Sequence, residues 1–412
     1  MSGHLWRRLV VVGALAAAGL ASIGGAAAGD AMENPPTSEA ARILGAAVRG
    51  ENYEVSPVVP SDGFLQIFTV NSKVGRFTVG GRELLNRRLK ELGALAALDK
   101  MSQSDLFSQS LVKSATSPVK FGFDLLRDPF GTVDQTVTGV TSAFGQIGAG
   151  LSNPNADPEG LAASAIGVSS AKRQLAAQLD VDPYTDFKPL SDKLTDVATT
   201  MALGGIGPKA AFSLIGGGAG LALSYSSTAD SVRDLVRDKT PAQLVELNAQ
   251  RLRAMGADEK TTHAFLGNEF FTIVDQTRIV EALHKLGKVS GRAAYVERAA
   301  GAHSRDLAFF LVRRAELIAD YQRSSGGMIV QFVSAKGFPL NKLADGRVIM
   351  IAPIDLLSWS ATPVQALAAI TSGLSASGKS VPVELRITGT ATPMAREFLR
   401  GLNWTVTEAK SN

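Results

Sequence analysis

The segment RVIMIAPID, residues 347–355, decides the fold class of the C-terminal part of this chain. It is short and rich in valine and isoleucine, the residue types that favour β-strands. Three further segments have the same character: GMIVQFVSA (327–335), VPVELRITG (381–389) and WTVTEA (404–409). Helix-like stretches at 362–379 and 392–403 separate the last three segments. This order predicts a small, mostly parallel sheet with right-handed crossovers, whose first strand is either parallel or antiparallel.

A four-residue motif occurs twice in this region, as Ser360-Ala361-Thr362-Pro363 and Thr390-Ala391-Thr392-Pro393. Each copy follows a predicted strand and opens a predicted helix, so a threonine cap followed by a first-turn proline explains both. A second interpretation is a ligand crevice, because helix N-termini at the carboxyl ends of neighbouring strands attract anions. The residues of that crevice would be Asp355, Ser360, Thr362, Thr390 and Thr392. No Gly-x-Ser-x-Gly motif is present to indicate a serine hydrolase.

Residues 229–324, which precede this region, have the apolar spacing of helices. Gly326 and Gly327 then mark a change of composition, so we expect a separate α/β domain over residues 326–412. The helical block contains His263, His284 and His303. Glu281 and His284 have the spacing of di-iron ligands, but a second copy is missing, and no zinc signature occurs. The sequence therefore predicts neither a metal site nor a cofactor.

The N-terminal half opens with a polar, proline-containing stretch, residues 29–60, which we interpret as a flexible lead-in. Residues 61–101 predict a β-hairpin around NSKVG (71–75), followed by a leucine-rich helix. Phe64, Phe68 and Phe77 are expected among the buried residues of the hairpin. Residues 102–325 are expected to be helical throughout, so the fold class is α+β, mainly helical.

One helix in this region has an uncharged polar face of serine, threonine and glutamine. Its apolar stripe consists of Val133, Val137, Val140, Phe144, Ile147 and Leu151. Such a stripe packs against protein or lies in a lipid interface. Both interpretations stay open from the sequence, and packing against neighbouring helices is preferred.

The most apolar internal stretch is MALGGIGPKAAFSLIGGGAGLALS, residues 201–224. Its glycine spacing fits neither a P-loop nor a dinucleotide fingerprint. Membrane insertion is an alternative, but Pro208 and Lys209 interrupt the run. We therefore expect two short helices in a glycine-rich apolar core, with a break near GGIGPK. Upstream, Asp180, Asp182 and Asp186 lack the pattern of an EF-hand loop, and we expect them to lie between two helices.

The N-terminus has the organisation of a secretory signal peptide. Arg7 and Arg8 precede an apolar run, and Ala26 and Ala28 have the spacing of a peptidase site, so residues 1–28 are the predicted signal. Export to the periplasm or the medium is expected, with an uncleaved inner-membrane anchor as the alternative. The chain has no cysteine, which fits a bacterial envelope protein better than a eukaryotic extracellular one.

Charge and composition narrow the function classes. Lys and Arg number 42 and Asp and Glu 38, so nothing indicates nucleic-acid binding. The sequence favours a non-catalytic envelope protein of interaction or structural type, whose partner is another envelope protein or a lipid surface. The alternative is a periplasmic enzyme, such as a carboxylate-based hydrolase, with its ligand crevice around Asp355. Such an enzyme would require a second titratable group beside Asp355. The oligomeric state does not follow from the sequence.

The stripe around Val140 generates a first prediction. If it packs against protein, Val140→Asp should lower the free energy of unfolding by about 3 kcal/mol or more, because a carboxylate would enter an apolar core without a partner. Urea unfolding of the purified protein measures this. An unchanged stability together with lost binding to small, highly curved vesicles would favour the lipid interface instead.

Overall fold

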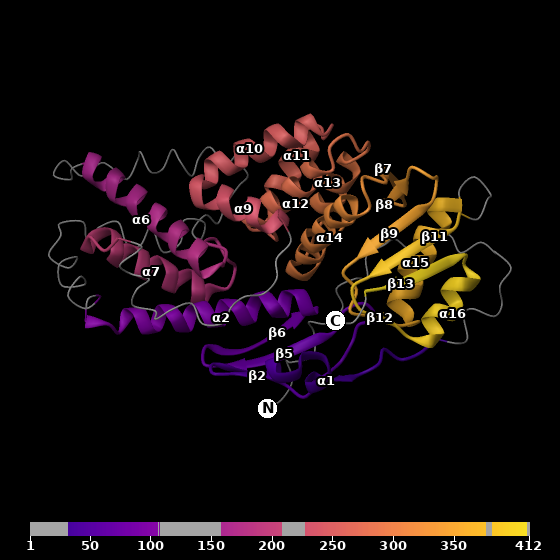
Figure 1. The fold of residues 1–412 in the computed structure, drawn as a ribbon, viewed down its shortest axis with the longest axis horizontal. Coiled ribbons are helices and arrows are strands. Elements are labelled where there is room, and N and C mark those ends of the chain that lie inside the picture. The colour runs from indigo at the N-terminus through magenta and orange to yellow at the C-terminus, as the bar shows by residue number, and fades with distance from the viewer. Residues whose placement is uncertain (1–31, 106, 108–157, 208–226, 376–380, 410–412) are drawn as a thin grey trace, which may run out of the picture. The chain divides into compact units, whose positions relative to one another are not determined.

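The computed structural model describes residues 32–105, 107, 158–207, 227–375 and 381–409 (Figure 1). Helices dominate these residues and the strands form small sheets, which confirms the predicted fold class. The stripe residues Val133–Leu151 lie outside the described part. Contacts divide the chain into two compact units, one made of Met1–Arg87, Tyr225–Val232 and Pro241–Asn412, the other of Arg88–Ser224 and Arg233–Thr240.

The first unit ends in an α/β layer. Its elements are the strands β7 (Ile329–Ala335), β8 (Phe338–Leu343), β9 (Val348–Ala352), β10 (Leu356–Leu357), β11 (Val383–Ile387), β12 (Thr390–Ala391) and β13 (Trp404–Glu408), and the helices α15 (Ala361–Leu374) and α16 (Pro393–Gly401). Five of the strands form one sheet in the order β13-β11-β9-β8-β7. The pairs β9–β11 and β11–β13 are parallel, whereas β8 pairs antiparallel with both of its neighbours.

Strand β9, the quoted segment, is buried on both of its faces. Val348, Met350 and Ala352 belong to the core shared with α15 and α16. Ile349 and Ile351 belong to the core on the other side, where helices cover the sheet. A strand between two helical layers can be apolar at every position, which is why this segment shows no alternation.

Strand β8 was not predicted, and its composition explains why. Its sequence FPLNKL contains a proline and an asparagine, which are depleted in strands. A proline normally argues against a central strand, because it has no N–H for the ladder. That argument fails here because β8 pairs with β9 only through Asn341 and Lys342, so Pro339 needs no N–H toward β9.

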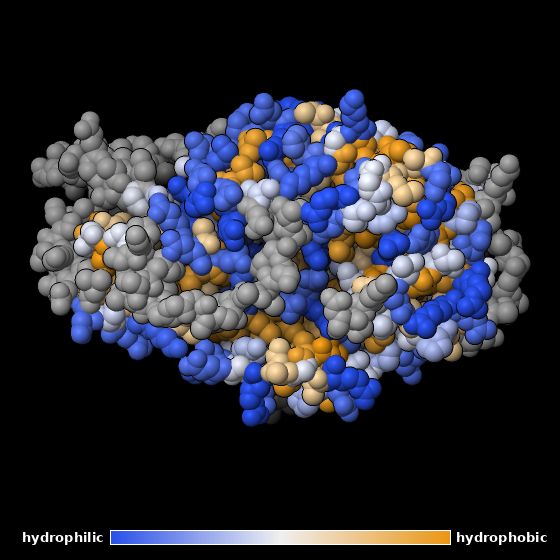
Figure 2. Space-filling model, viewed as in Figure 1, coloured by the Kyte–Doolittle hydropathy of each residue, from blue (hydrophilic) through white to orange (hydrophobic). Residues whose placement is uncertain are grey.

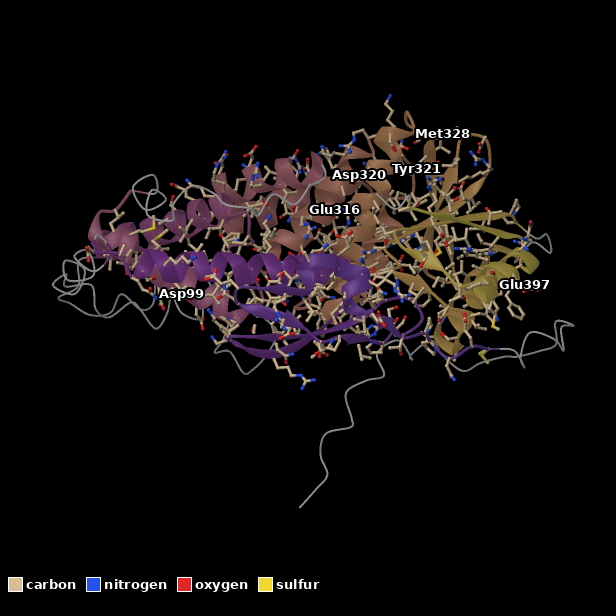
Figure 3. All side chains as sticks on the ribbon, turned by 60° about the horizontal axis from the view of Figure 1, so that its bottom comes forward. Asp99, Glu316, Asp320, Tyr321, Met328 and Glu397 are labelled. Carbon is tan, nitrogen blue, oxygen red and sulfur yellow. The ribbon has the colours of Figure 1, made fainter. Side chains whose placement is uncertain are left out.

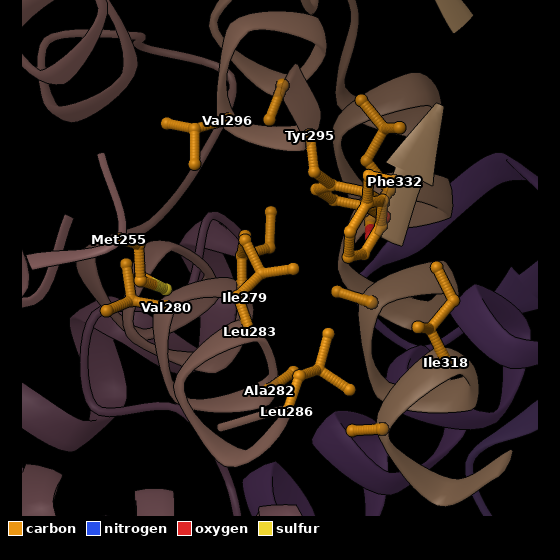
Figure 4. Packing of buried hydrophobic residues seen from close by; sticks show 14 of the residues in the cluster. Met255, Ile279, Val280, Ala282, Leu283, Leu286, Tyr295, Val296, Ile318 and Phe332 are labelled. Carbon is orange, nitrogen blue, oxygen red and sulfur yellow. The ribbon is translucent and has the colours of Figure 1, made fainter. Parts of the chain in front are cut away.

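Helices α13 (Ala293–Ala300) and α14 (Arg305–Ser324) cover one face of this sheet. Helices α10 (Pro241–Ala254), α11 (Glu259–Leu266) and α12 (Ile273–Lys285) pack against these two and against one another. Figure 4 shows their shared core, in which Ile279 and Leu283 of α12 lie near Ile318 of α14 and Phe332 of β7. This core joins the helices to the sheet across Gly326 and Gly327. The independent folding of residues 326–412 stays a prediction, and such a fragment would expose Phe332.

Arg314 anchors α14 to the sheet from within this core. Its side chain is fully buried, and Nε donates a hydrogen bond of 2.8 Å to the carbonyl oxygen of Ile351. Nη2 donates to the carbonyl oxygen of Pro339, and the guanidinium carbon lies 4.4 Å from the ring centroid of Phe338. Burial lowers the pKa of Arg314. Carbonyl oxygens and an aromatic ring therefore accommodate a cation in an otherwise apolar layer.

The N-terminal part of this unit contains more regular structure than the sequence predicted. Its elements are β1 (Ser38–Glu39), α1 (Ala40–Leu44), the 3₁₀ helix η1 (Gly45–Val48), β2 (Arg49–Gly50), β3 (Tyr53–Val55), β4 (Val58–Val59), β5 (Ile67–Ser72), β6 (Gly75–Gly80) and α2 (Arg82–Ser102), which continues into the second unit. The hairpin β5–β6 is present as predicted, with Phe68 buried and Phe64 and Phe77 partly buried. Residues 29–60, expected as a flexible lead-in, include β3, which pairs with β5. Backbone hydrogen bonds do not depend on side-chain type, so a polar segment can join the sheet.

The second unit consists of α2 from Arg88 onward, α6 (Pro158–Leu179), α7 (Lys188–Gly204) and the last residues of α9 (Ser227–Asp238). Leu98, Leu175, Leu194 and Met201 are among its fully buried side chains. Helix α7 ends at Gly204, and Gly205 adopts the left-handed conformation, so a helix does end within GGIGPK. The rest of the glycine-rich stretch, from residue 208, lies outside the described residues. Among the helices that are described, none is long and apolar enough to cross a bilayer.

Gly389 generates a prediction about the sheet. A Cβ at this position would lie 1.8 Å from the carbonyl oxygen of Asp355, a backbone atom that cannot move aside alone. We expect Gly389→Ala to lower the free energy of unfolding by about 2–4 kcal/mol in urea titrations. Gly401→Ala is the control, because nothing lies within 4 Å of its Cβ position. Equal stabilities of the two variants would contradict this packing.

Candidate functional site

Asp355 lies just beyond β9 and binds the N-terminal part of the same unit. Its Oδ2 accepts hydrogen bonds from the backbone N–H groups of Gln66 and Arg82, both at 3.1 Å. Arg82 is the first residue of α2, and Gly81 before it has no side chain that could cap the helix. Asp355 therefore caps α2 from 273 positions away in the sequence. The backbone N–H of Asp355 also donates to the carbonyl oxygen of Phe64, at 3.0 Å.

A small pocket surrounds this carboxylate. Its lining includes two other acidic residues, Glu83 and Asp306, together with Arg313 and the rings of Phe309 and Phe310. The second titratable group that an enzyme would require is thus present. The cavity has a volume of about 20 Å³, which is enough for a water molecule and far below the volume of a substrate site.

Burial raises the pKa of Asp355 to about 6, and the negative charge of Glu83 acts in the same direction. The two backbone N–H groups and Arg82 favour the ionised carboxylate but do not overcome burial. Asp355 is only 7 % exposed. Its carboxyl group can therefore change charge near neutral pH, although it has little access to a solute.

The other predicted crevice residues lie elsewhere in this unit. None of Ser360, Thr362, Thr390 and Thr392 lines the pocket of Asp355. Thr392 caps α16 as predicted, and its Oγ1 accepts a hydrogen bond of 3.1 Å from the N–H of Ala395. Thr390 is exposed, and it meets Asp355 only through the backbone, where its N–H donates to the carbonyl oxygen of Asp355.

The first copy of the repeated motif departs from the second. Helix α15 begins at Ala361, so Ser360 occupies the cap position and Thr362 lies inside the first turn. The assignment of Thr362 as a cap was therefore wrong, because a proline is tolerated throughout a first turn, where its missing N–H has no helical partner. Ser360 makes no capping bond to the helix and instead lies 3.0 Å from the hydroxyl of Ser358.

Glu33 is the functional candidate that sequence reasoning missed. Its Oε1 accepts a hydrogen bond of 2.6 Å from the backbone N–H of Trp359 and another from the hydroxyl of Thr392. Its own N–H donates to the carbonyl oxygen of Trp359, at 3.0 Å. A carboxylate thus lies beside the start of α15 and the cap of α16, where the sequence predicted an anion. A single glutamate before two prolines gives no signal of a partner that lies 326 positions away.

A second missed group is the buried ion network around Asp275. Burial alone would raise the pKa of this fully buried carboxyl, but the guanidinium groups of Arg305, Arg87 and Arg278 overcome it and hold the pKa far below its usual range. Arg87 and Arg305 lie 2.9 and 2.6 Å from its oxygens. All three guanidinium groups also lie within 6 Å of the ring centroid of Phe309.

Glu316 extends this network along α14, the helix that also carries Asp320 and Tyr321 in Figure 3. Arg278 binds its carboxylate at 2.8 and 3.1 Å, and Arg313 at 3.2 Å. The network thereby connects α2, α12 and α14. Because its acidic groups are paired with arginines, it is suited to holding helices together rather than to reacting with a substrate.

The remaining candidate residues are either exposed or paired with a basic side chain. His263, His284 and His303 are exposed, and Glu281 forms an ion pair with Arg251. In the second unit, Asp180, Asp182 and Asp186 lie between α6 and α7 as expected. Asp180 pairs with Lys90 and Asp186 with Arg88. Within the described ranges, no group of three or more His, Asp or Glu side chains could hold a metal ion.

Comparison with known proteins gives no family for this chain. No protein-family model matches it, and neither a curated protein nor a solved structure is significantly similar to it.

The raised pKa of Asp355 generates a prediction with a definite sign. Its pKa is about 6 in the folded state against an ordinary value of 3.8, so the folded protein holds this proton more tightly than the unfolded chain. The favourable contribution is present below pH 3.8 and is lost as the pH rises to 6, a change of about 3 kcal/mol. In Asp355→Asn the amide oxygen can accept the same two N–H groups without a charge.

We therefore expect the stability of the wild type to fall between pH 4 and pH 7.5 by about 2.5 kcal/mol more than that of Asp355→Asn, measured by urea unfolding. Other carboxyl groups titrate in both proteins, and their contribution cancels in this comparison. Asp105→Asn, at an exposed carboxylate, is the control for loss of a charge. If the difference in unfolding free energy between Asp355→Asn and the wild type were the same at pH 4 and at pH 7.5, protonation of Asp355 would not contribute to the pH dependence of stability.

Proposed function

We propose that this protein is an exported protein of the bacterial cell envelope with an interaction or structural role. The observation that carries the interaction or structural role is the environment of Asp355, the carboxyl group around which the sequence predicted a ligand crevice. It is occupied by two backbone N–H groups, and the cavity beside it accommodates a water molecule rather than a substrate. The pairing of Asp275 and Glu316 with arginines supports the same conclusion.

The surface of the described residues supports an interaction role without naming the partner. Figure 2 shows a mainly hydrophilic face over α10 and α11. The exposed large hydrophobic residues include Met32 and Val58, which belong to the N-terminal part of the first unit. The proposed partner is another envelope protein or the lipid surface.

A hydrolase remains the second candidate, because one specific observation favours it. Asp355, Glu83 and Asp306 line the same pocket, and neighbouring carboxyl groups can serve as general acid and general base. This function would require the pocket to open. In-cell cross-linking distinguishes the two: the interaction role predicts cross-linked envelope proteins that Asp355→Asn retains, whereas a hydrolase of a small substrate predicts no such cross-linked partner.

Export is tested by the N-terminus of the processed protein. We expect a chain expressed in a Gram-negative host to appear in the periplasmic fraction and to begin near Gly29, as read by N-terminal sequencing. Ala28→Lys should leave the chain uncleaved, because a signal peptidase requires a small residue there. Ala27→Lys is the matched control, since its position between the two small residues is permissive. An intact Met1 in washed membranes would favour the uncleaved anchor.

A further inference from the structure

The N-terminal segment of the described chain, residues 32–37, is an extended arm that is attached at both of its ends. At one end Glu33 binds Trp359 through both its backbone and its carboxylate. At the other end β1 follows, pairs with β4 and places Ser38 beside Gln66. Pro35 and Pro36 between these ends favour the extended backbone.

Two donors bind the carboxylate of Glu33, the backbone N–H of Trp359 and the hydroxyl of Thr392. We call this pair of donors the seat; it requires a hydrogen-bond acceptor. Oγ1 of Thr392 already accepts the N–H of Ala395, so its proton is directed to another acceptor, and the N–H of Trp359 is also a donor. Both bonds end on Oε1 of Glu33. A carboxylate satisfies both donors, whereas an ammonium group satisfies neither.

The seat is also rigid. Trp359 is 3 % exposed, and its ring stacks on Phe398 of α16 with a centroid distance of 4.9 Å and an interplanar angle of 2°. Its indole Nε1 is buried without a hydrogen-bond partner among the described residues. The stacking holds Trp359, which lies just before α15, against α16.

We propose that this seat is a binding site for an extended peptide that carries an acidic side chain, and that the chain's own arm occupies it as a displaceable competitor. This inference deepens the proposed interaction role and rests on it, since it names the chemistry of the partner. The arm is tethered, and tethering gives it an effective concentration on the order of 1 mM. A partner in trans therefore competes with Glu33. Removal of the Glu33 carboxylate weakens this competitor, because only the backbone bond to Trp359 and the pairing of β1 with β4 then hold the arm.

The test uses the full chain from Gly29 and a labelled peptide of residues 29–40, GDAMENPPTSEA. In fluorescence anisotropy, Glu33→Ala should bind this peptide at least tenfold more tightly than the wild type. Glu39→Ala is the matched control, because Glu39 is an exposed carboxylate on the same segment. A peptide with Glu33→Leu, which has no acceptor for the two donors, should bind the Glu33→Ala protein at least tenfold more weakly than the unchanged peptide does.

A second protein variant tests the seat itself. Thr392→Asp keeps a good helix cap but opposes a carboxylate with a negative charge, so Glu33→Ala/Thr392→Asp should lose the peptide while its circular dichroism is unchanged. Equal peptide binding by the wild type, Glu33→Ala and the double variant would overturn the proposal.

A third measurement leaves the seat intact in case Glu33→Ala does not fold. The chain has no cysteine and Met32 is 48 % exposed, so Met32→Cys can carry an environment-sensitive dye. Excess unlabelled peptide should shift the emission of this dye, and the Glu33→Leu peptide should not. No shift with either peptide would overturn the proposal. If the peptide bound as expected but in-cell cross-linking gave no envelope partner, the peptide-binding site would be supported. Only the proposed interaction role in the cell envelope would be contradicted.

Discussion

The carboxyl group of Asp355 joins the C-terminal sheet of the first unit to the N-terminal part of the same unit. It lies where β9 ends and accepts the backbone N–H groups of Gln66 and Arg82, so one side chain fixes both the hairpin β5–β6 and the start of α2. Glycine at position 389 is required by the same arrangement, because a side chain there would overlap the Asp355 carbonyl. A group with this many structural partners is poorly suited to bind a substrate, although burial raises its pKa to about 6.

Buried charge is the second constraint on this fold. Asp275 and Glu316 are buried carboxylates, and each is stable only because arginines from other elements surround it. Arg314 solves the same problem differently, with carbonyl oxygens and aromatic faces in place of a carboxylate. These groups specify how α2, α12 and α14 meet one another and the sheet. Removal of one partner would leave an uncompensated charge in the core.

The N-terminal arm links the proposed export to the proposed binding site. Cleavage after Ala28 would make Glu33 the fifth residue of the mature chain, so processing would leave only four residues before the group that occupies the seat at Trp359 and Thr392. An arm that is short and bound by few hydrogen bonds is suited to exchange with a peptide from another protein.

The sequence by itself determined the elements whose signals are local. The apolar run of β9, the hairpin around NSKVG, the leucine spacing of α2 and the Thr392 cap were all readable, because each depends on neighbours within a few residues. Tertiary structure alone decided that β8 joins the sheet, that α15 begins before Thr362, and that Glu33 and Asp355 bind backbone groups hundreds of residues away. Those outcomes depend on which donors the folded chain leaves without partners, and a donor's partner is set by packing rather than by residue type or spacing.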